Sequence, residues 1–365
     1  MRITHILMCS SPHVLLLYFL VAPFTVIKES TFFFFSSDSV NDRRRLKRFL
    51  PYSHIFDNVE IAGKRLRGMG GNKVLKFFLL FKIGCSLLVQ CWGIRLFRFF
   101  LWPFLQTAEI LGTDHLAFEA ALIGRRTYTL IEDGLGNYSN SLIERIRLGK
   151  IPFVVLRSLI VGPLLRKCLG LGPQARKIIM TGLAELPDCY RGKVVEIVSM
   201  EKLWREALEE KKVFIRQFFD LTPEDLEVSR GRDVLFIAQP FAVDGLMTQE
   251  EQIVLIRKVL ERYGVSKVAL KPHPRETLNF VELFPEVCVL KKSVPMELMN
   301  LCGVTFSRVV TINSTAALNF SCEVELDWLG TDLDTHWFDH LSALSRGRFA
   351  RFLKEVPLPD AVRKS

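Results

Sequence analysis

The sequence predicts an α/β protein of two domains, each built on a parallel sheet. Its 365 residues suffice for about two domains, and 49% hydrophobic residues are enough to bury two cores. From residue 108 onward, short β-branched runs alternate with helical patterns. Strands separated by helices in this way form βαβ units with parallel pairing. The same composition excludes a chain that is disordered over most of its length.

The first 36 residues predict a strand, a turn, a buried helix and a second strand. Residues 3–9 form the first strand, a helix begins near His13 after a Ser-Ser-Pro turn, and residues 32–35 form the next strand. The helix is apolar, but Pro23 interrupts it before it reaches the roughly 18 residues that a membrane span requires. A targeting or anchoring segment is the alternative interpretation.

The domain organisation follows from the spacing of prolines and of strand patterns. We expect an N-terminal domain over residues 1–150, a helical hinge over 151–192, a C-terminal domain over 193–340, and a C-terminal helix and tail over 341–365. The predicted strands of the C-terminal domain are 193–198, 234–238, 267–270, 287–290, 308–312 and 324–327, and its predicted helices are 202–209, 249–263, 295–301 and 314–320.

The charge of the chain indicates an anionic partner. There are 49 Lys and Arg against 39 Asp and Glu, which leaves a net charge of +10 and favours nucleic acid, an anionic membrane or phosphorylated substrates. Basic clusters at 43–48 and 64–67 precede a Phe- and Trp-rich stretch at 74–105, which suits either a core or a membrane interface. The eight cysteines lack zinc-ligand spacing, which favours buried thiols in a reducing cytoplasm.

Two adjacent carboxylates follow the predicted strand 127–131, at the end where open α/β sheets bind their ligands. Gly134 and Gly136 let the chain turn away behind Glu132 and Asp133, so one acid can point into the crevice while backbone donors hold the other back. A carboxylate in that place suits a general base that accepts the proton of an attacking alcohol. An ordinary acidic turn is the alternative, and of the two acids the sequence favours Glu132.

A histidine between two prolines follows another predicted strand. Pro272 and Pro274 restrict the backbone on either side of His273 and hold its imidazole at the strand end. Lys271 and Arg275 make the surroundings cationic, which suits a phosphate to which His273 donates a hydrogen bond or a proton. A structural histidine is the alternative interpretation.

Two further candidate segments open predicted helices. Asn313, Ser314 and Thr315 stand at a strand-to-helix junction, where a hydroxyl can cap the helix and the first N–H groups can bind an anion. Glu297 lies in the first turn of the helix at 295–301, from which its carboxylate can accept two ribose hydroxyls. Simple capping and an ordinary first-turn acid are the alternatives.

In chain order these segments contain Glu-Asp-Gly, Lys-Pro-His-Pro, Pro-Met-Glu and a Ser-Thr pair, and together they resemble the bacterial sialyltransferases. The fuller pattern is similar to glycosyltransferase family 52, the lipooligosaccharide sialyltransferases. It adds an opening strand that ends in Cys-Ser-Ser-Pro, Gly-Thr-Asp-His-Leu before the acidic motif, and Ala-Gln-Pro before the His-Pro motif. The resemblance extends from about residue 3 to residue 330.

This resemblance implies two Rossmann-like domains facing a cleft, the GT-B type of glycosyltransferase. It implies an inverting, metal-independent transfer of sialic acid from a CMP-activated donor to a terminal sugar of a lipooligosaccharide or capsular glycan. Glu132 or Asp133 would be the base, and His273 would act as the acid at the donor phosphate. The implied donor-binding residues are Lys271 at the cytosine, Glu297 at the ribose, Ser314 and Thr315 at the phosphate, and Gln239, Pro274 and Asn313 beside them.

Several alternatives stay open. In some family members the base is an aspartate after a strand of the second domain, where Asp244 is the nearest acid here. Other members transfer glucose, which makes a UDP-sugar donor an alternative. A non-catalytic membrane- or nucleic-acid-binding protein is the rival from another class, but no nucleic-acid-binding motif is present, so we expect no nucleic-acid partner. We expect a glycan or lipid-linked glycan acceptor and a place on the cytoplasmic face of the inner membrane; a homodimer is left open.

Overall fold

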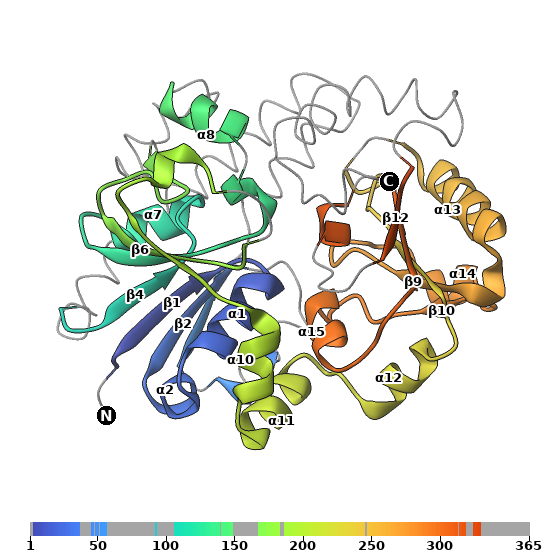
Figure 1. The fold of residues 1–365 in the computed structure, drawn as a ribbon, viewed down its shortest axis with the longest axis horizontal. Coiled ribbons are helices and arrows are strands. Elements are labelled where there is room, and N and C mark those ends of the chain that lie inside the picture. The colour runs from blue at the N-terminus through green and yellow to red at the C-terminus, as the bar shows by residue number, and fades with distance from the viewer. Residues whose placement is uncertain are drawn as a thin grey trace. The chain divides into compact units, whose positions relative to one another are not determined.

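The protein was analysed as a computed structural model, which describes residues 3–36, 45–46, 48–50, 52–56, 92, 106–138, 140–148, 167–182, 186–244, 247–312, 314–318 and 324–329. These residues fall into two compact units, one up to Lys212 and one from Val213 onward. Each unit contains a parallel sheet with helices packed beside it (Figure 1).

The first unit has a seven-stranded parallel sheet with the strand order β3-β2-β1-β4-β5-β6-β7. The order reverses between β1 and β4, which is the topological switch point where such sheets bind ligands. The strands are β1 His5–Cys9, β2 Thr31–Ser36, β3 Ser53–Phe56, β4 Glu109–Gly112, β5 Tyr128–Ile131, β6 Ala175–Met180 and β7 Val194–Ile197. The helices of this unit are α1 Pro12–Val21, α2 Phe24–Glu29, α7 Ala117–Ile123, α8 Asn140–Arg147 and α10 Met200–Glu206, with 3-10 helices at Leu135–Tyr138 and Asp188–Tyr190.

The turn from β1 into α1 is built by Ser11 and Pro12. The Ser11 hydroxyl accepts a hydrogen bond from the backbone N–H of Val14 (3.3 Å), which caps α1, and Pro12 supplies a preset φ in the first turn. The apolar helix is buried from Val14 to Leu20 and ends ahead of Pro23. The predicted order of strand, turn, buried helix and strand is therefore confirmed.

One glycine is required at the switch point of the first sheet. Gly112 has a φ of 126°, and a Cβ built there would lie 1.8 Å from the carbonyl oxygen of Met8. Any side chain would therefore push β4 away from β1, where the loops that carry the candidate site begin.

The second unit has a five-stranded parallel sheet with the order β10-β9-β8-β11-β12, which reverses between β8 and β11. Its strands are β8 Val234–Ile237, β9 Val268–Lys271, β10 Cys288–Val289, β11 Arg308–Thr311 and β12 Glu325–Trp328. Its helices are α12 Pro223–Ser229, α13 Gln249–Tyr263, α14 Phe280–Leu283 and α15 Met296–Leu301, with 3-10 helices at Val265–Lys267 and Thr315–Leu318. Helix α11, Glu209–Phe218, spans the boundary between the two units.

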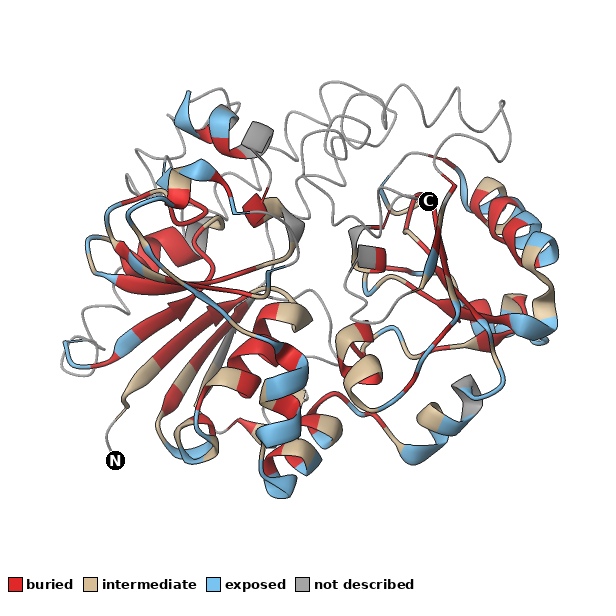
Figure 2. Ribbon diagram, viewed as in Figure 1, coloured by how far each residue is buried: buried red, intermediate tan, exposed pale blue. Residues whose placement is uncertain are grey.

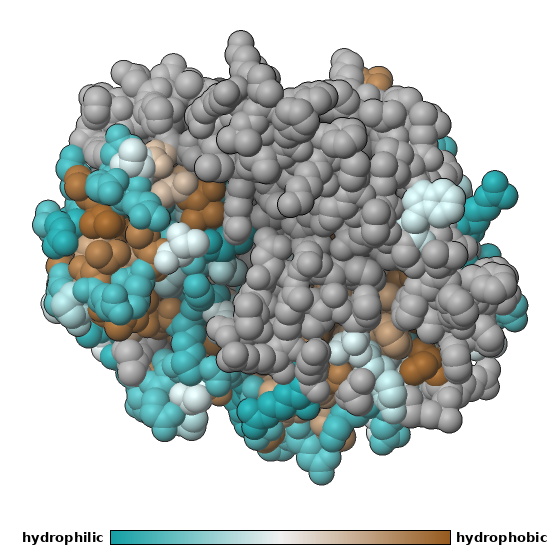
Figure 3. Space-filling model, turned by 180° about the vertical axis from the view of Figure 1, so that it is seen from behind, coloured by the Kyte–Doolittle hydropathy of each residue, from teal (hydrophilic) through white to brown (hydrophobic). Residues whose placement is uncertain are grey.

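The strands and the inward faces of the helices form the buried core of each unit (Figure 2). Helix α13 shows the pattern, since Leu255, Ile256, Val259 and Leu260 are buried while Val254 is 45% exposed. On the face drawn in Figure 3, hydrophobic and hydrophilic side chains of the described residues are interspersed. Of the described cysteines, Cys9, Cys168 and Cys288 are buried thiols, whereas Cys189 and Cys302 are half-buried.

Three features differ from the sequence-based expectations. Strands β6 and β7 belong to the first sheet, whereas residues 151–192 were expected to form a helical hinge and residue 193 to open the second domain. The described chain divides at Lys212 and Val213 instead. The strand pattern of β6 is obscured by charged residues at its exposed positions, and β7 lies at the sheet edge with Val194 and Ile197 exposed. The helix expected at 314–320 is described as a 3-10 helix over Thr315–Leu318.

Candidate active site

In the first unit, Glu132 lies at the carboxyl end of β5 and is sealed from solvent. Its exposed fraction is 0%, and its oxygens accept hydrogen bonds from the Tyr138 hydroxyl (2.7 Å) and from the backbone N–H and the hydroxyl of Thr181 (2.7 Å each). The Nε2 atom of His13 lies 3.6 Å from Glu132 Oε1. Three donors on a buried carboxylate anchor β5 to the segment after β6, which is a structural use of the charge.

The neighbouring Asp133 has the opposite character. Its side chain is 22% exposed, and the Ser11 hydroxyl that caps α1 donates a hydrogen bond to Oδ1. The Nε2 atom of His115 lies 3.5 Å from Asp133 Oδ2. The Asp133 backbone N–H donates to Asn137 Oδ1 (2.9 Å), which fixes the direction of the loop. Residues after β1, β4 and β5 therefore meet at this half-exposed carboxylate, which is the arrangement that a proton acceptor requires.

Two other acids of the first unit are buried and structural. Asp114 accepts hydrogen bonds from the Tyr128 hydroxyl and from the N–H groups of Leu169 (2.7 Å) and Gly170 (2.9 Å), and burial raises its pKa. Glu119 caps the start of α7 by accepting from the Leu116 N–H (2.9 Å), and burial raises its pKa to about 7. Neither side chain is exposed, so neither can meet a substrate.

In the second unit, His273 follows β9 and is held in one tautomer. Its Nδ1 atom accepts a hydrogen bond from the backbone N–H of Arg275 (3.1 Å), so the neutral ring carries its proton on Nε2. Burial and the positive charges of Arg275 and Lys271 lower its pKa to about 4, although Asp244 opposes the shift. His273 is therefore a neutral N–H donor at pH 7, in a setting whose nearby cations favour an anionic ligand.

Lys271 is buried at the end of β9, with 5% of its surface exposed. Its ammonium group donates to the backbone carbonyl of Lys291, and burial lowers its pKa to about 7, while the charge of Glu297 on α15 opposes the shift. The charge of Glu297 therefore acts on Lys271, and the charge of Lys271 acts on His273. A bound anion would raise the pKa of Lys271 and of His273.

The loop after β8 joins this cluster through an ion pair. The Arg275 guanidinium donates to both oxygens of Asp244, at 2.5 and 3.1 Å. Asp244 is thus engaged with a cation beside His273. Gln239 is half-buried in the same loop, and its carbonyl accepts the N–H of Phe241 (3.0 Å), whereas the side chain of Pro274 is exposed.

The hydroxyl segment after β11 is described only in part. Ser314 is 4% exposed, and its backbone N–H donates to the hydroxyl oxygen of Thr311 (2.9 Å), which in turn donates to the carbonyl of Ile237 (3.1 Å). These bonds join the ends of β11 and β8 at the switch point of the second sheet. Asn313 and the side chain of Thr315 lie outside the described residues.

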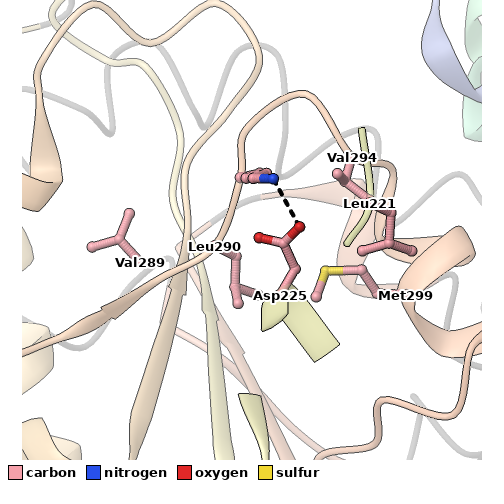
Figure 4. A pocket seen from close by; sticks show the side chains of 7 residues that line it. Leu221, Asp225, Val289, Leu290, Val294 and Met299 are labelled. Atoms are coloured by element: carbon pink, nitrogen blue, oxygen red, sulfur yellow. Dashed lines mark ion pairs between the residues drawn. The ribbon is translucent and has the colours of Figure 1, made fainter. Parts of the chain in front are cut away.

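A pocket of about 400 Å³, including space open to solvent, lies beside Lys291 in the second unit (Figure 4). Apolar side chains form most of its wall, and the Asp225 carboxylate in it pairs with the Lys291 ammonium at 2.8 Å. Because the Lys291 carbonyl also accepts the Lys271 ammonium, the pocket adjoins the cationic cluster. Its lining residues are Leu221, Asp225, Val289, Leu290, Lys291, Val294 and Met299.

The sequence motifs contain the candidate residues but not the groups that hold them. Ser11 and His115 are recognisable as partners of Asp133 only in the folded structure, since they lie far from it in the chain. The buried pair Gln252 and Glu276 was not singled out, because nothing local marks them as contacts. In the part of the chain that is described, no three His, Cys, Asp or Glu side chains are grouped to hold a metal ion.

Known proteins match this chain over more than half of its length. Residues 109–334 match the sequence profile of Glycosyltransferase family 52. An uncharacterised protein of Haemophilus influenzae is 29% identical over 229 residues, which cover 63% of this chain and 70% of that protein.

Solved structures are similar at much lower sequence identity. An alpha/beta-galactoside alpha-2,3-sialyltransferase of Photobacterium phosphoreum is similar with a TM-score of 0.51 and 12% identity, covering 94% of this chain and 96% of the other. The GT-B domain of a sialyltransferase from Photobacterium damselae has a TM-score of 0.47 and 10% identity, with 94% and 97% covered. The predicted α/β fold with two domains, each built on a parallel sheet, is confirmed by the strand order of the two units, and the first of these structures shares it. The chain belongs to glycosyltransferase family 52 and is a glycosyltransferase.

Proposed function

We propose that the protein is an inverting sialyltransferase that uses a CMP-activated donor without a metal ion. Its acceptor is a terminal sugar of a lipooligosaccharide or capsular glycan. The observation that carries the proposal is the state of His273, a neutral imidazole with its proton on Nε2 beside Lys271 and Arg275. Such a group suits the single phosphate of a departing CMP, whose charge these cations and the N–H donor can neutralise without a metal.

The reaction step balances with these groups. The acceptor hydroxyl oxygen attacks the anomeric carbon of sialic acid while the bond from that carbon to the CMP phosphate oxygen breaks. The acceptor proton passes to Asp133, and the negative charge left on the phosphate is met by His273 Nε2–H, while the buried Lys271 ammonium acts on it through its charge. A single displacement of this kind inverts the anomeric configuration.

The base in this proposal is Asp133, whereas the sequence favoured Glu132. Glu132 has no exposed surface and accepts three hydrogen bonds, whereas Asp133 is half-buried and oriented by Ser11 and His115. Asp244, the alternative base, is engaged by the Arg275 guanidinium. Its ion pair favours a role in holding the loop over a role in proton transfer.

A UDP-sugar donor, such as UDP-glucose, is the second candidate. The discriminating experiment is the melting temperature of the protein with CMP, UMP or UDP, each in the presence of EDTA. A ligand that binds only the folded state raises stability by RT ln(1 + [L]/Kd), so CMP alone should raise the melting temperature. Stabilisation by UDP instead of CMP, or stabilisation by CMP that disappears with EDTA, would contradict the proposal.

We further propose that the protein acts at the cytoplasmic face of the inner membrane, where a lipid-linked acceptor is presented. The support is the basic sequence at 43–48 and 64–67 and the aromatic stretch at 74–105. Most of these residues lie outside the described part of the chain, but Trp92 is described and is 60% exposed. Among the described residues, no helix has the length and hydropathy of a membrane span.

A further inference from the structure

Gln252 and Glu276 form a buried polar pair in the second unit, and Glu276 lies three residues after His273 in the chain. Gln252, on α13, has an exposed fraction of 0%, and Glu276, in the loop after β9, has 2%. The Gln252 amide Nε2 donates to Glu276 Oε2 at 2.6 Å. The other Glu276 oxygen accepts the backbone N–H groups of Thr277 (2.8 Å) and Leu278 (2.9 Å). The carboxylate is thus satisfied on both oxygens by these three N–H donors, and the described part of the chain places no cation on either oxygen.

The pair connects the loops that follow three neighbouring strands. Gln252 Oε1 accepts the N–H of Ala242 in the loop after β8 (2.7 Å). The backbone carbonyl of Glu276 accepts the ammonium of Lys292 in the loop after β10 (2.9 Å). These loops stand at the carboxyl ends of β8, β9 and β10, the edge where this sheet presents its candidate donor site.

The same pair reaches His273 through the backbone. The N–H of Glu276 donates to the carbonyl of His273 (2.9 Å), and the intervening Arg275 N–H donates to the imidazole Nδ1 (3.1 Å). The turn from His273 to Glu276 is therefore closed at its far end by a buried, fully bonded carboxylate. Any shift of that carboxylate moves the turn whose amide selects the His273 tautomer.

We infer that Gln252 and Glu276 are positioning residues that hold His273 with its Nε2–H directed at the donor phosphate. This inference rests on the proposed function, because it assigns the pair to the same phosphate site. Neither side chain has enough exposed surface to touch a substrate, so both act through His273. Preorganisation of this kind matters because a misplacement of about 1 Å in a reacting group can cost about 100-fold in rate.

The hydrogen-bond pattern supplies a test by exchange of the two residues. In Glu276→Gln, the new amide oxygen can accept the Thr277 and Leu278 N–H groups only if the new amide nitrogen faces the Gln252 amide nitrogen. Two donors then face each other, and the hydrogen bond between the two side chains is lost. If Gln252 then turns over, its nitrogen faces the N–H of Ala242, so one bond is lost in either orientation. The double variant Gln252→Glu with Glu276→Gln satisfies every partner again, with the carboxylate in the first turns of α13, where the helix dipole favours it.

The experiment measures CMP release from CMP-N-acetylneuraminic acid with lactose as the probe acceptor, well below each variant's melting temperature. Glu276→Gln should lower turnover at least tenfold, and the double exchange should restore it to within about threefold. In a His273→Ala background, Glu276→Gln should change turnover less than twofold, because residues that act as a unit are not additive. A merely structural pair would alter the melting temperature and leave turnover of the folded protein unchanged.

A milder variant keeps the test valid if Glu276→Gln does not fold. Lys292→Met removes an exposed side chain that holds the Glu276 carbonyl, and it should lower turnover about threefold in the wild type and not in His273→Ala. Lys267→Met, an exposed lysine without a place in the pair, is the matched control and should leave turnover unchanged. Normal turnover of folded Glu276→Gln, normal turnover of Lys292→Met where Glu276→Gln does not fold, or effects that add to that of His273→Ala would overturn the inference. Normal turnover of His273→Ala itself would instead overturn the proposed function.

Discussion

The two adjacent acids after β5 should separate cleanly under conservative substitution. Glu132→Gln and Asp133→Asn make the same chemical change one residue apart, yet the first alters a buried anchor and the second a half-exposed carboxylate. Each therefore serves as the control for the other. We expect Glu132→Gln to lose stability and keep turnover, and Asp133→Asn to lose turnover and keep stability.

The magnitudes follow from the contacts. Glu132 accepts three hydrogen bonds. Bonds to a charged group contribute about 1.5–3 kcal/mol each, against about 1 for neutral bonds. An amide is easier to bury than a carboxylate, which offsets part of the lost hydrogen-bond energy. Glu132→Gln should therefore lower the free energy of unfolding by about 1–3 kcal/mol and the melting temperature by roughly 2–10 °C. Asp133→Asn keeps an oxygen for the Ser11 hydroxyl and loses mainly a partly exposed contact with His115, which is worth about 0–1 kcal/mol.

The effect on catalysis should be the reverse. General base catalysis contributes about 10²–10⁴-fold, so Asp133→Asn should lower turnover at least 100-fold, whereas Glu132→Gln should stay within about threefold of the wild type. The assay is CMP release with a probe acceptor, paired with thermal unfolding of the same samples. If folded Glu132→Gln loses turnover while Asp133→Asn retains it, the assignment of the base by burial is refuted.

Three further predictions concern the donor site and the membrane. His273→Ala should lower turnover at least 100-fold with little change in melting temperature, and near wild-type turnover on a natural acceptor would remove it from the mechanism. CMP should bind more weakly as the pH rises from 7 to 9: the Lys271 pKa is about 7 in the free protein and is raised by bound phosphate, so binding takes up a proton and is favoured at the lower pH. CMP itself is already a dianion over this range, so its own titration does not cause the change. Lys271→Arg should flatten the pH dependence of the CMP dissociation constant, which isothermal titration calorimetry can measure. An equally steep pH dependence in Lys271→Arg would assign the proton uptake to another group. Wild-type protein should sediment with anionic vesicles, and the sedimented fraction should fall at high salt and when five cationic residues and two tryptophans are replaced. Protein that stays in the supernatant at low salt would exclude membrane binding. The residues replaced are Arg43, Arg44, Arg45, Lys47, Arg48, Trp92 and Trp102.

Local signals predicted those elements whose ends are chemically marked. Helix α13 was predicted with its observed bounds because Thr248 and Glu251 form a capping box at its start and Gly264 ends it. Strand β6 was missed because Arg176 and Lys177 interrupt its apolar run, and only the pairing with β5 and β7 identifies it. Edge strand β7 was predicted as a strand, but its expected place in the C-terminal domain was wrong, because only its pairing with β6 identifies its sheet.

The candidate site was predictable as a set of motifs and not as a set of roles. Glu132 and Asp133 are adjacent acids of equal chemistry, and their difference arises from Tyr138 and Thr181, which close over one of them. Gln252 and Glu276 are complementary only because α13 and the loop after β9 pack together. Relations of this kind depend on tertiary packing, which hydrophobic periodicity does not encode.

Sialyl transfer from a CMP-activated donor is tested most sharply by a transfer reaction with competing donors. Equimolar CMP-N-acetylneuraminic acid and UDP-glucose are supplied with EDTA and a lactose-terminated lipooligosaccharide. The transferred sugar is identified by mass spectrometry, and the configuration of the new linkage is determined by NMR. We expect a sialylated product whose anomeric configuration is inverted relative to the donor. A glucosylated product, retention of configuration, or no transfer until a divalent metal is added would contradict it.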